Sequence, residues 1–354
     1  MTDPFVGQTL NGYEITRYKG QGAFSLVYEA NHVASGTPVA IKLLKPGAVP
    51  EQIREFDNEG DLLVALSGAA NVVNILDTQT CPLTVTLTGS TIPMTIVARF
   101  HVLELADGCL DELVARIDQI PWNERLSLYR DVVLGVHQMH CGSVVHRDVK
   151  SSNCLLFEKP MQTLMAKVND LGRARDLRRS AIASAIHYRT GRGDPNFMPP
   201  ELLWQLGRDD AVTHRSADLY GLGSLMYELV TGQGLTSVAI FPRAHVLHAD
   251  LALPDARRSL QYRARHDELR SWIESALAIA EPGIPKAITW PTVDLIRQLC
   301  NPDPLLRFPK VIGGKRRPLP ADLNWLLRRT DILIKTLSNA EAQRIREGRK
   351  KARS

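Results

Sequence analysis

At 354 residues the chain is too long for one small core, and a composition of 44% hydrophobic and 23% charged residues excludes a disordered chain. Five scattered cysteines without a Cys-x-x-Cys pair argue against a disulfide framework and against a zinc site. The net charge is 43 minus 38, or +5, and part of the excess lies in the terminal run RIREGRKKARS. Such a run is more typical of a solvated tail than of a nucleic-acid arm, so we expect no nucleic-acid partner.

The chain also shows no sign of membrane insertion or export. No window of about 18 apolar residues is present. The start, MTDPFVGQTLNGYEI, lacks the charged and then apolar pattern of a signal peptide. We therefore expect a cytoplasmic protein without a membrane span.

Two kinds of periodicity divide the chain. Residues 10–105 are rich in strand-type segments, namely GYEITRYKG, SLVYEANH, PVAIKLLK, LTVTLTG and TIVARFHVLELA. Only residues 51–66 look helical there, whereas from about Asp111 helical patterns such as WNERLSLYRDVVLGVHQMH dominate. This predicts an α+β fold of two lobes, a small β-rich one (about 10–105) and a larger helical one (about 107–310), joined near LELADG.

The segment KGQGAFSLVYEA places Gly20 and Gly22 before an alternating strand. Glycines in such a loop let backbone amides approach a phosphate closely. The pair is also typical of a plain hairpin turn. It is not a Walker loop, because no Gly-Lys-Ser/Thr follows, and a strand rather than a helix comes next.

In the strand PVAIKLL, Lys42 shares one face with the small Ala40. A lone lysine on a strand usually faces solvent, but the next helix suggests a partner. There Glu59 lies three residues after Phe56 and four before Leu63, on the apolar stripe. A carboxylate that faces inward needs a cation, and Lys42 is the candidate.

Two other residues of this helix carry expectations. Glu55 lies off the apolar stripe, so we expect it to be solvated. Gly60 costs about 1 kcal/mol relative to alanine in the middle of a helix. That cost predicts a helix that can shift.

The stretch VVHRDVKSSNCLL holds a short polar loop between two apolar pairs, a setting in which side chains are held for chemistry. The following CLLFEKPMQTLMAKVND reads as a strand, a turn at Lys159 and Pro160, and a second strand. A hairpin would bring Asn153 and Asp170 together at its open end. An amide oxygen and a carboxylate are hard ligands suited to Mg²⁺, which leaves Asp148 to act on a hydroxyl nucleophile.

Taken in order, these segments resemble the signature set of the protein kinase superfamily. The resemblance covers about residues 10–310 and rests on GQGAFSLV, VAIK, the helix glutamate, HRDVKSSN, DLG and MPPE. It extends to Asp218 in SADLYGLG and to Arg307 in NPDPLLRFP, which resembles the arginine that pairs with the glutamate of MPPE, Glu201. Lys150 after Arg147 and Asp148 resembles serine/threonine kinases of the Hanks type rather than tyrosine kinases.

The resemblance implies a role for each of these residues, with ATP and Mg²⁺ as ligands. Asp148 would accept or orient the substrate hydroxyl, and Lys150 would stabilise the transferring phosphoryl group. Lys42, paired with Glu59, would hold the α and β phosphates. Asn153 and Asp170 would bind two Mg²⁺ ions. The residues implied to contact ATP are Gly20, Gln21, Gly22, Ala23, Phe24, Ser25, Val27, Ala40, Lys42, the gatekeeper Leu103, the hinge Glu104, Leu105 and Ala106, and Leu155.

The same resemblance implies regulation in the segment 173–199. Arg147, before the catalytic aspartate, suggests control by phosphorylation there, with Ser180, Ser184 and Thr190 as acceptors. Transient self-association would serve autophosphorylation. An unmodified flexible loop is the plain alternative for these hydroxyls.

The chain departs from the family pattern at three places. Ser25 replaces the third glycine of the loop and Leu171 replaces the phenylalanine of Asp-Phe-Gly, and the family tolerates both changes. Asp194 stands where the family has a threonine that bonds to the catalytic aspartate and lysine. It adds a negative charge beside Asp148, and we expect an ion pair with Lys150.

Three hypotheses for function follow. The first is an ATP-dependent, Mg²⁺-requiring kinase that phosphorylates serine or threonine of protein substrates. The second, motivated by Asp194, is a nucleotide-binding pseudokinase scaffold. The third, a phosphotransferase for a small molecule, ranks last because those enzymes lack an MPPE segment and a long activation loop.

Three parts of the chain have no role in this scheme. The segments 78–99 and 233–290 are longer than the family usually has. The sequence of residues 311–354 predicts a basic C-terminal extension of one or two helices that pack on the large lobe. Its end would dock an acidic partner or simply aid solubility.

Overall fold

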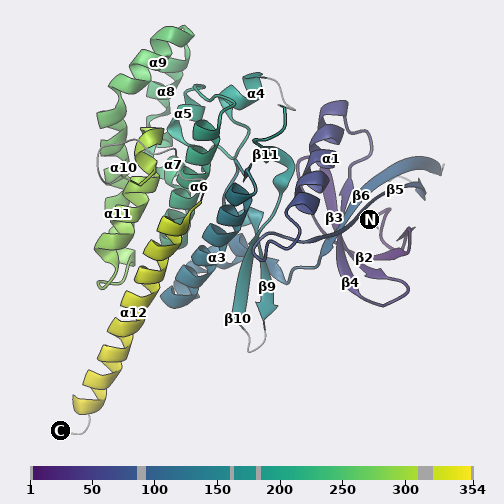
Figure 1. The fold of residues 1–354 in the computed structure, drawn as a ribbon, viewed down its shortest axis with the longest axis horizontal. Helices are drawn as coiled ribbons and strands as arrows, with labels where there is room; N and C mark the ends of the chain where they lie inside the picture. Colours follow the sequence, from purple (N-terminus) through teal and green to yellow (C-terminus); the bar gives the residue numbers. More distant parts are fainter. Residues whose placement is uncertain (1–2, 86–92, 160–162, 181–184, 310–321, 352–354) are drawn as a thin grey trace. The chain divides into compact units, whose positions relative to one another are not determined.

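The computed structural model describes residues 3–85, 93–159, 163–180, 185–309 and 322–351. The chain divides into two compact units, a β-rich one and a mostly helical one (Figure 1). The first unit holds Met1–Asp107 with Asp170–Gly172, and the second holds Gly108–Asn169 with Arg173–Ser354. The predicted α+β fold with a small β-rich lobe and a larger helical lobe is confirmed.

A sheet of six antiparallel strands, counted over the described residues, forms the first unit. Its strands lie in the order β1-β2-β3-β4-β6-β5. Their bounds are β1 Thr9–Leu10, β2 Tyr13–Gln21, β3 Ser25–His32, β4 Pro38–Leu44, β5 Ile75–Val85 and β6 Met94–Glu104. Each consecutive pair is antiparallel, and Lys42 of β4 stands directly opposite His101 of β6. Residues opposite one another point to the same face of a sheet, which matters for the site.

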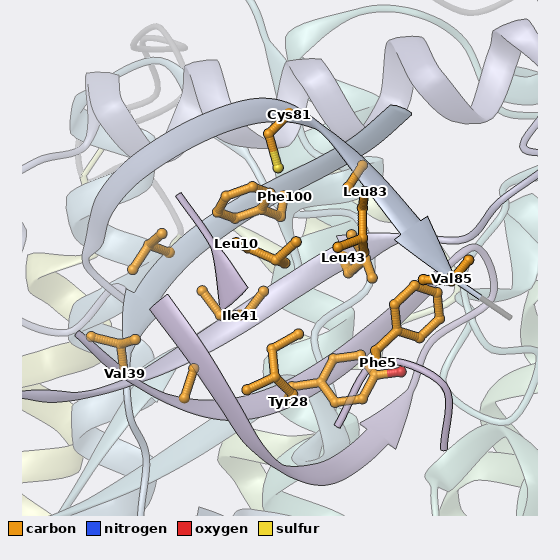
Figure 2. Packing of buried hydrophobic residues seen from close by; sticks show 14 residues of the cluster. Phe5, Leu10, Tyr28, Val39, Ile41, Leu43, Cys81, Leu83, Val85 and Phe100 are labelled. Carbon is orange, nitrogen blue, oxygen red and sulfur yellow. The ribbon is translucent and has the colours of Figure 1, made fainter. Parts of the chain in front are cut away.

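The long β5–β6 hairpin helps to build the core of this unit (Figure 2). Both strands have 11 residues. Cys81, Leu83 and Val85 of β5 are buried in one cluster with Phe5 and Tyr28. The additional length at 78–99 therefore adds apolar side chains to a core that the shorter strands alone would cover less well.

One long helix, α1 at Pro50–Ala65, accompanies the sheet, as the periodicity predicts. Phe56 and Leu63 on its apolar stripe are each 1% exposed. The expectation that Glu55 is solvated was wrong, because its side chain is buried. Leu62, seven residues later and hence on the same side of the helix, is also buried, so the covered face is wider than the stripe.

The second unit is built around α6. Its helices are α2 Leu110–Val114, α3 Trp122–Cys141, α4 Ala185–Thr190, α5 Pro200–Leu203, α6 Ala211–Thr231, α7 Leu235–Ala239, α8 Ala244–Leu251, α9 Asp255–Ala264, α10 His266–Ala280, α11 Thr289–Leu299 and α12 Asn324–Lys351. The Asp210 side chain caps α6 by accepting from Thr213 N at 2.7 Å, and Gly232 ends it with a φ of 76°. Residues 216–230 are all buried, so α6 is the core helix of the unit.

Short strands of the second unit carry the polar loop. Strands β7 Gly108–Cys109, β9 Cys154–Lys159 and β10 Thr163–Val168 form one sheet, and β8 Val144–Val145 pairs with β11 Arg175–Asp176. The predicted hairpin is present as β9 and β10, with Pro160 of its turn outside the described residues. Asn169 N donates to Asn153 O at 2.9 Å at its open end.

Helix α12 runs antiparallel along α3 (Figure 1). Leu323 N donates to Nδ1 of His137, and Arg130 Nε lies 2.5 Å from Asp331 Oδ1, nearer the start of α3. Leu333 and Leu337 are buried, whereas residues 342–350 are exposed. Among the described residues, no helix is long and apolar enough to cross a membrane.

The helices of the 233–290 segment are tied to the rest of the unit by a buried carboxylate. Asp250 of α8 accepts from Trp204 Nε1 at 2.9 Å and from Arg265 Nε at 2.6 Å. A carboxylate that is satisfied in this way holds two parts of the chain together. The segment therefore has a packing role that the sequence did not reveal.

A second buried contact joins distant parts of the unit. Arg307 is 0% exposed and makes two bonds to Glu201, at 2.7 and 2.6 Å. Its guanidinium also lies over the ring of Tyr220 and donates to Ser216 O. The pairing that the family resemblance implied is thus present, and it fixes α5 against α6.

We predict that Glu201→Gln lowers the free energy of unfolding by about 3–5 kcal/mol, because it leaves the Arg307 charge buried without a counter-charge. Urea unfolding of the whole chain measures this. The matched control is Glu274→Gln, which removes an exposed carboxylate from Arg297 and should cost less than about 1 kcal/mol. Equal losses in the two variants would contradict the assignment.

Candidate active site

The glycine loop joins β2 to β3 in the first unit. Gly22 N donates to Ser25 O at 2.9 Å, which closes the turn. Lys45 Nζ donates to Gly22 O at 2.8 Å and to Ala23 O at 3.3 Å. Lys45 therefore stabilises the loop through two of its carbonyl oxygens. This role of Lys45 was not predicted from the sequence.

Lys42 binds two carboxylates of the first unit. Its Nζ lies 2.6 and 2.7 Å from the oxygens of Glu59 and 3.0 Å from Oδ1 of Asp170. Burial alone would lower the pKa of Lys42, but the charges of Asp170 and Glu59 outweigh it and raise the pKa above its usual value. The amine is thus held as a cation, and the predicted contact with Glu59 is present.

The remaining residues expected near ATP fall into both units. Leu103 and Glu104 end β6, and Asn74 N donates to Glu104 Oε1 at 2.7 Å. Leu105 and Ala106 follow at the edge of the first unit, while Leu155 lies on β9 of the second. The others belong to the first unit, on β2, β3, β4 and the loop between β2 and β3, and they are Gly20, Gln21, Gly22, Ala23, Phe24, Ser25, Val27 and Ala40.

A buried aspartate shapes the polar loop of the second unit. Asp218 accepts from His146 N at 2.9 Å and from Arg147 N at 2.6 Å. It also binds Nε2 of His140 at 2.8 Å. Arg147 has a φ of 70°, a conformation that costs energy for a residue other than glycine. The two bonds to Asp218 hold it there.

Asp148 follows and lies among donors and cations. Its Oδ1 accepts from Asp194 N at 2.9 Å, and its Oδ2 lies 3.2 Å from Asn153 Nδ2. Lys150 Nζ is 3.7 Å and Arg173 NH1 is 3.4 Å from the same Oδ2. Lys150 also lies 3.3 Å from Asp194 Oδ2, so the expected ion pair is present. Arg173 was not expected at Asp148.

Asn153 has the donor chemistry of a magnesium ligand. Its Nδ2 donates to the backbone O of Asp148 at 2.8 Å. Because a carbonyl oxygen only accepts, this bond fixes the amide orientation and identifies Oδ1 as the acceptor atom of the side chain. Asp170, in the first unit, has a φ of 60° and a side chain that is 46% exposed. Both residues thus present oxygen donors of the kind that Mg²⁺ prefers.

Glu228 of α6 was not predicted from the sequence as a residue of the site. Ser151 donates to it from Oγ at 2.6 Å and from N at 3.3 Å. Burial is the main cause that raises the pKa of Glu228 from 4.5 to about 7. The available signal was a carboxylate inside the apolar run GLGSLMYELV, which needs a buried partner just as Glu59 does.

Arg147 is a cation without an ion pair among the described residues. Its guanidinium lies 4.8 Å from the ring centroid of Tyr188 and donates to Arg173 O at 3.1 Å. Burial is the main cause that lowers its pKa. A half-buried cation served only by a ring and carbonyls is suited to receive an anion.

Comparison with known proteins gives consistent matches. The family model described as protein kinase domain matches residues 13–309. Serine/threonine-protein kinase ATG1c of Arabidopsis thaliana is 28% identical over 230 residues, which are 65% of this chain and 28% of the relative. Serine/threonine-protein kinase Pkn1 of Myxococcus xanthus is 30% identical over 65% of this chain and 30% of its own length. Serine/threonine-protein kinase fused of Drosophila melanogaster is 26% identical over 83% and 31%. The chain thus spans less than a third of these relatives.

We predict that Glu228 makes stability depend on pH. A pKa raised from 4.5 to about 7 means that the folded protein keeps a proton that the unfolded chain loses in this interval. The free energy of unfolding therefore decreases as pH rises through it, by up to about 3 kcal/mol. Glu228→Gln should remove that decrease.

Urea unfolding of both proteins at about pH 5 and about pH 7.5 tests this, since the other titrating groups cancel in the difference between the proteins. Identical pH dependence in wild type and Glu228→Gln would contradict the prediction.

Proposed function

This chain belongs to the protein kinase family, among the serine/threonine-protein kinases, and on that premise we propose that it transfers the γ-phosphoryl group of ATP to serine and threonine hydroxyls of protein substrates. The observation that carries the proposal is Asp148, whose carboxylate is fixed on both oxygens by the chain itself. A chain that only bound nucleotide would have no use for that arrangement. We propose a cytoplasmic location.

Nucleotide binding is assigned chiefly to the first unit. The loop Gly20–Ser25 covers the phosphates with backbone amides, and Lys42 holds the α and β phosphates. Glu59 keeps that amine in place at 2.6 Å. Leu103 and the hinge after it meet the adenine. The small Ala40 beside Lys42 leaves room for the base.

Asn153 and Asp170 are assigned to two Mg²⁺ ions. Bound Mg²⁺ neutralises phosphate charge and orients the transferring group. The amide orientation of Asn153, fixed by its bond to the backbone of Asp148, supports this role. The left-handed backbone of Asp170 supports it as well, since strained residues gather at functional sites.

Asp148 orients the substrate hydroxyl and accepts its proton. Lys150, 3.7 Å from that carboxylate, stabilises the charge that develops on the transferring oxygens. Ser151 and Glu228 hold the loop that carries Lys150. Positioning and electrostatic stabilisation are the terms that such a transfer needs from the protein.

We further propose that the kinase phosphorylates its own activation segment, through transient association of two copies. Ser180 is exposed, Thr190 Oγ1 donates to Ile186 O at 3.0 Å, and Ser184 lies outside the described residues. Arg147, half-buried and without an anion among the described residues, is the receptor for the new phosphate.

We predict that the purified chain with Mg²⁺ and labelled ATP incorporates phosphate into itself and into a general protein substrate. Mass spectrometry would locate label on Ser180, Ser184 or Thr190. Asp148→Asn and Asp170→Ala should each reduce incorporation by at least about 100-fold, because one removes the proton acceptor and the other a metal ligand. Undiminished turnover by Asp148→Asn would rule out the proposed role.

We predict a separate role for Asp194 in setting the rate. Asp194→Asn removes the carboxylate partner of Lys150 and should lower kcat by about tenfold with little change in the KM for ATP. The matched control is Asp267→Asn, an exposed aspartate paired with Arg270. A raised KM with unchanged kcat would place Asp194 in nucleotide binding instead.

A further inference from the structure

His101 lies beside Lys42, the partner of Glu59, in the sheet of the first unit. Lys42 on β4 and Thr78 on β5 are its direct partners across the sheet. The three side chains therefore stand in one row on the same face of three neighbouring strands. His101 is 1% exposed, and the helix above it is α1.

The ring of His101 contacts α1 in two ways. It stacks on Phe56 with centroids 4.0 Å apart and planes 7° apart. Its Nε2 lies 3.0 Å from Phe56 O. A carbonyl oxygen only accepts, so Nε2 carries the hydrogen. Phe56 O is also the acceptor that a regular helix assigns to the amide of Gly60.

The second ring nitrogen is bound to the sheet. Nδ1 of His101 lies 2.5 Å from Oγ1 of Thr78. Burial lowers the pKa of His101 to about 4, so the ring is neutral near pH 7 and Nδ1 accepts the hydroxyl hydrogen. Thr78, His101 and Phe56 thus form one chain of hydrogen bonds from β5 to α1.

Gly60 shows how closely the ring and the helix fit. A Cβ built on Gly60 would lie 2.6 Å from Cε1 of His101 and 3.2 Å from each ring nitrogen. Any other residue at this position would push the helix off the ring. Gly60 directly follows Glu59, so a displacement here moves the carboxylate that holds Lys42.

We propose that His101 is a positioning residue, whose ring fills the space between β6 and the bare Cα of Gly60 and thereby sets α1 at the distance where Glu59 reaches Lys42. The effect on turnover rests on the proposed function, whereas the effect on the Lys42–Glu59 contact does not. Gly60 then serves to let the helix approach the ring of His101 closely. The sequence had suggested instead that Gly60 lets the helix shift.

Gly60→Ala is the first test, read by labelling of Lys42 with an amine-reactive reagent and mass spectrometry. Lys42 is 7% exposed. In Gly60→Ala its labelling should rise to the level of Glu59→Gln, which removes the carboxylate directly. The exposed Lys19 is the internal reference. Turnover, where present, should fall by about tenfold or more in kcat/KM.

The matched control is Gly348→Ala in α12, the same change in a helix with no atom within 4 Å of the new Cβ. It should leave labelling and turnover as in the wild type. Helix propensity alone favours alanine at both positions, so a loss confined to Gly60→Ala comes from the contact with His101.

Two further variants separate the proposed role from a general loss of stability. Gly60→Ala with His101→Ala removes the clash, so Lys42 labelling should return toward that of His101→Ala alone. His101→Phe keeps a stacked ring without hydrogen bonds and should label nearly as the wild type does. If Gly60→Ala does not fold, the labelling of Lys42 in the double variant and in His101→Ala can still be compared, and this comparison tests the proposal.

Wild-type labelling in a folded Gly60→Ala would overturn the proposal, and so would a double variant that labels more strongly than His101→Ala alone. If labelling follows the expected pattern while the wild-type chain shows no phosphoryl transfer, the positioning role stands and the proposed function fails.

Discussion

Much of the second unit depends on one buried carboxylate, that of Asp218. It accepts from two successive backbone amides, His146 N and Arg147 N, and binds His140. A charge with 1% exposure is tolerable only when several donors satisfy it. Those donors in turn hold Arg147 in its left-handed conformation, and the loop beyond it therefore places Asp148, Lys150 and Asn153. The core helix is therefore stable only when the loop has this geometry, because the loop amides satisfy the buried charge of Asp218.

Helix α6 supports that loop with close packing as well as with charge. A Cβ on Gly221 would lie 2.9 Å from Cβ of Val149, between Asp148 and Lys150. About two turns later, Glu228 holds Ser151. Asp218, Gly221 and Glu228 therefore secure the beginning, the middle and the end of the loop. The buried face of α6 therefore supports the loop as well as the apolar core.

Sequence patterns predicted the contacts that lie within one periodic element or between neighbours. The stripe on 51–66 placed Glu59 inward toward Lys42, and the hairpin placed Asn153 at its open end. The pattern failed where a side chain is buried by a segment far away in sequence. Glu228 and Arg173 reach the loop from 77 and 25 residues away, a relation that no local periodicity contains.

The same limit applies to Gly60, where composition and structure lead to different interpretations. A glycine inside a helix lowers its stability whatever surrounds it, and from the sequence this cost predicts a helix that can shift. The ring of His101, placed by the register of β6 against β4, shows instead that a Cβ has no room. The strand pairing, 41 residues away, decides what the glycine does. A helix residue can therefore be explained only after the sheet beneath it is known.

Asp194 raises a problem of charge that the loop itself resolves. A second carboxylate beside Asp148 would repel its negative charge. Lys150 lies 3.3 Å from Asp194 and 3.7 Å from Asp148, and Arg173 lies 3.4 Å from Asp148. Two carboxylates and two cations leave the cluster neutral. Arg173 thus balances the charge that Asp194 adds beside Asp148.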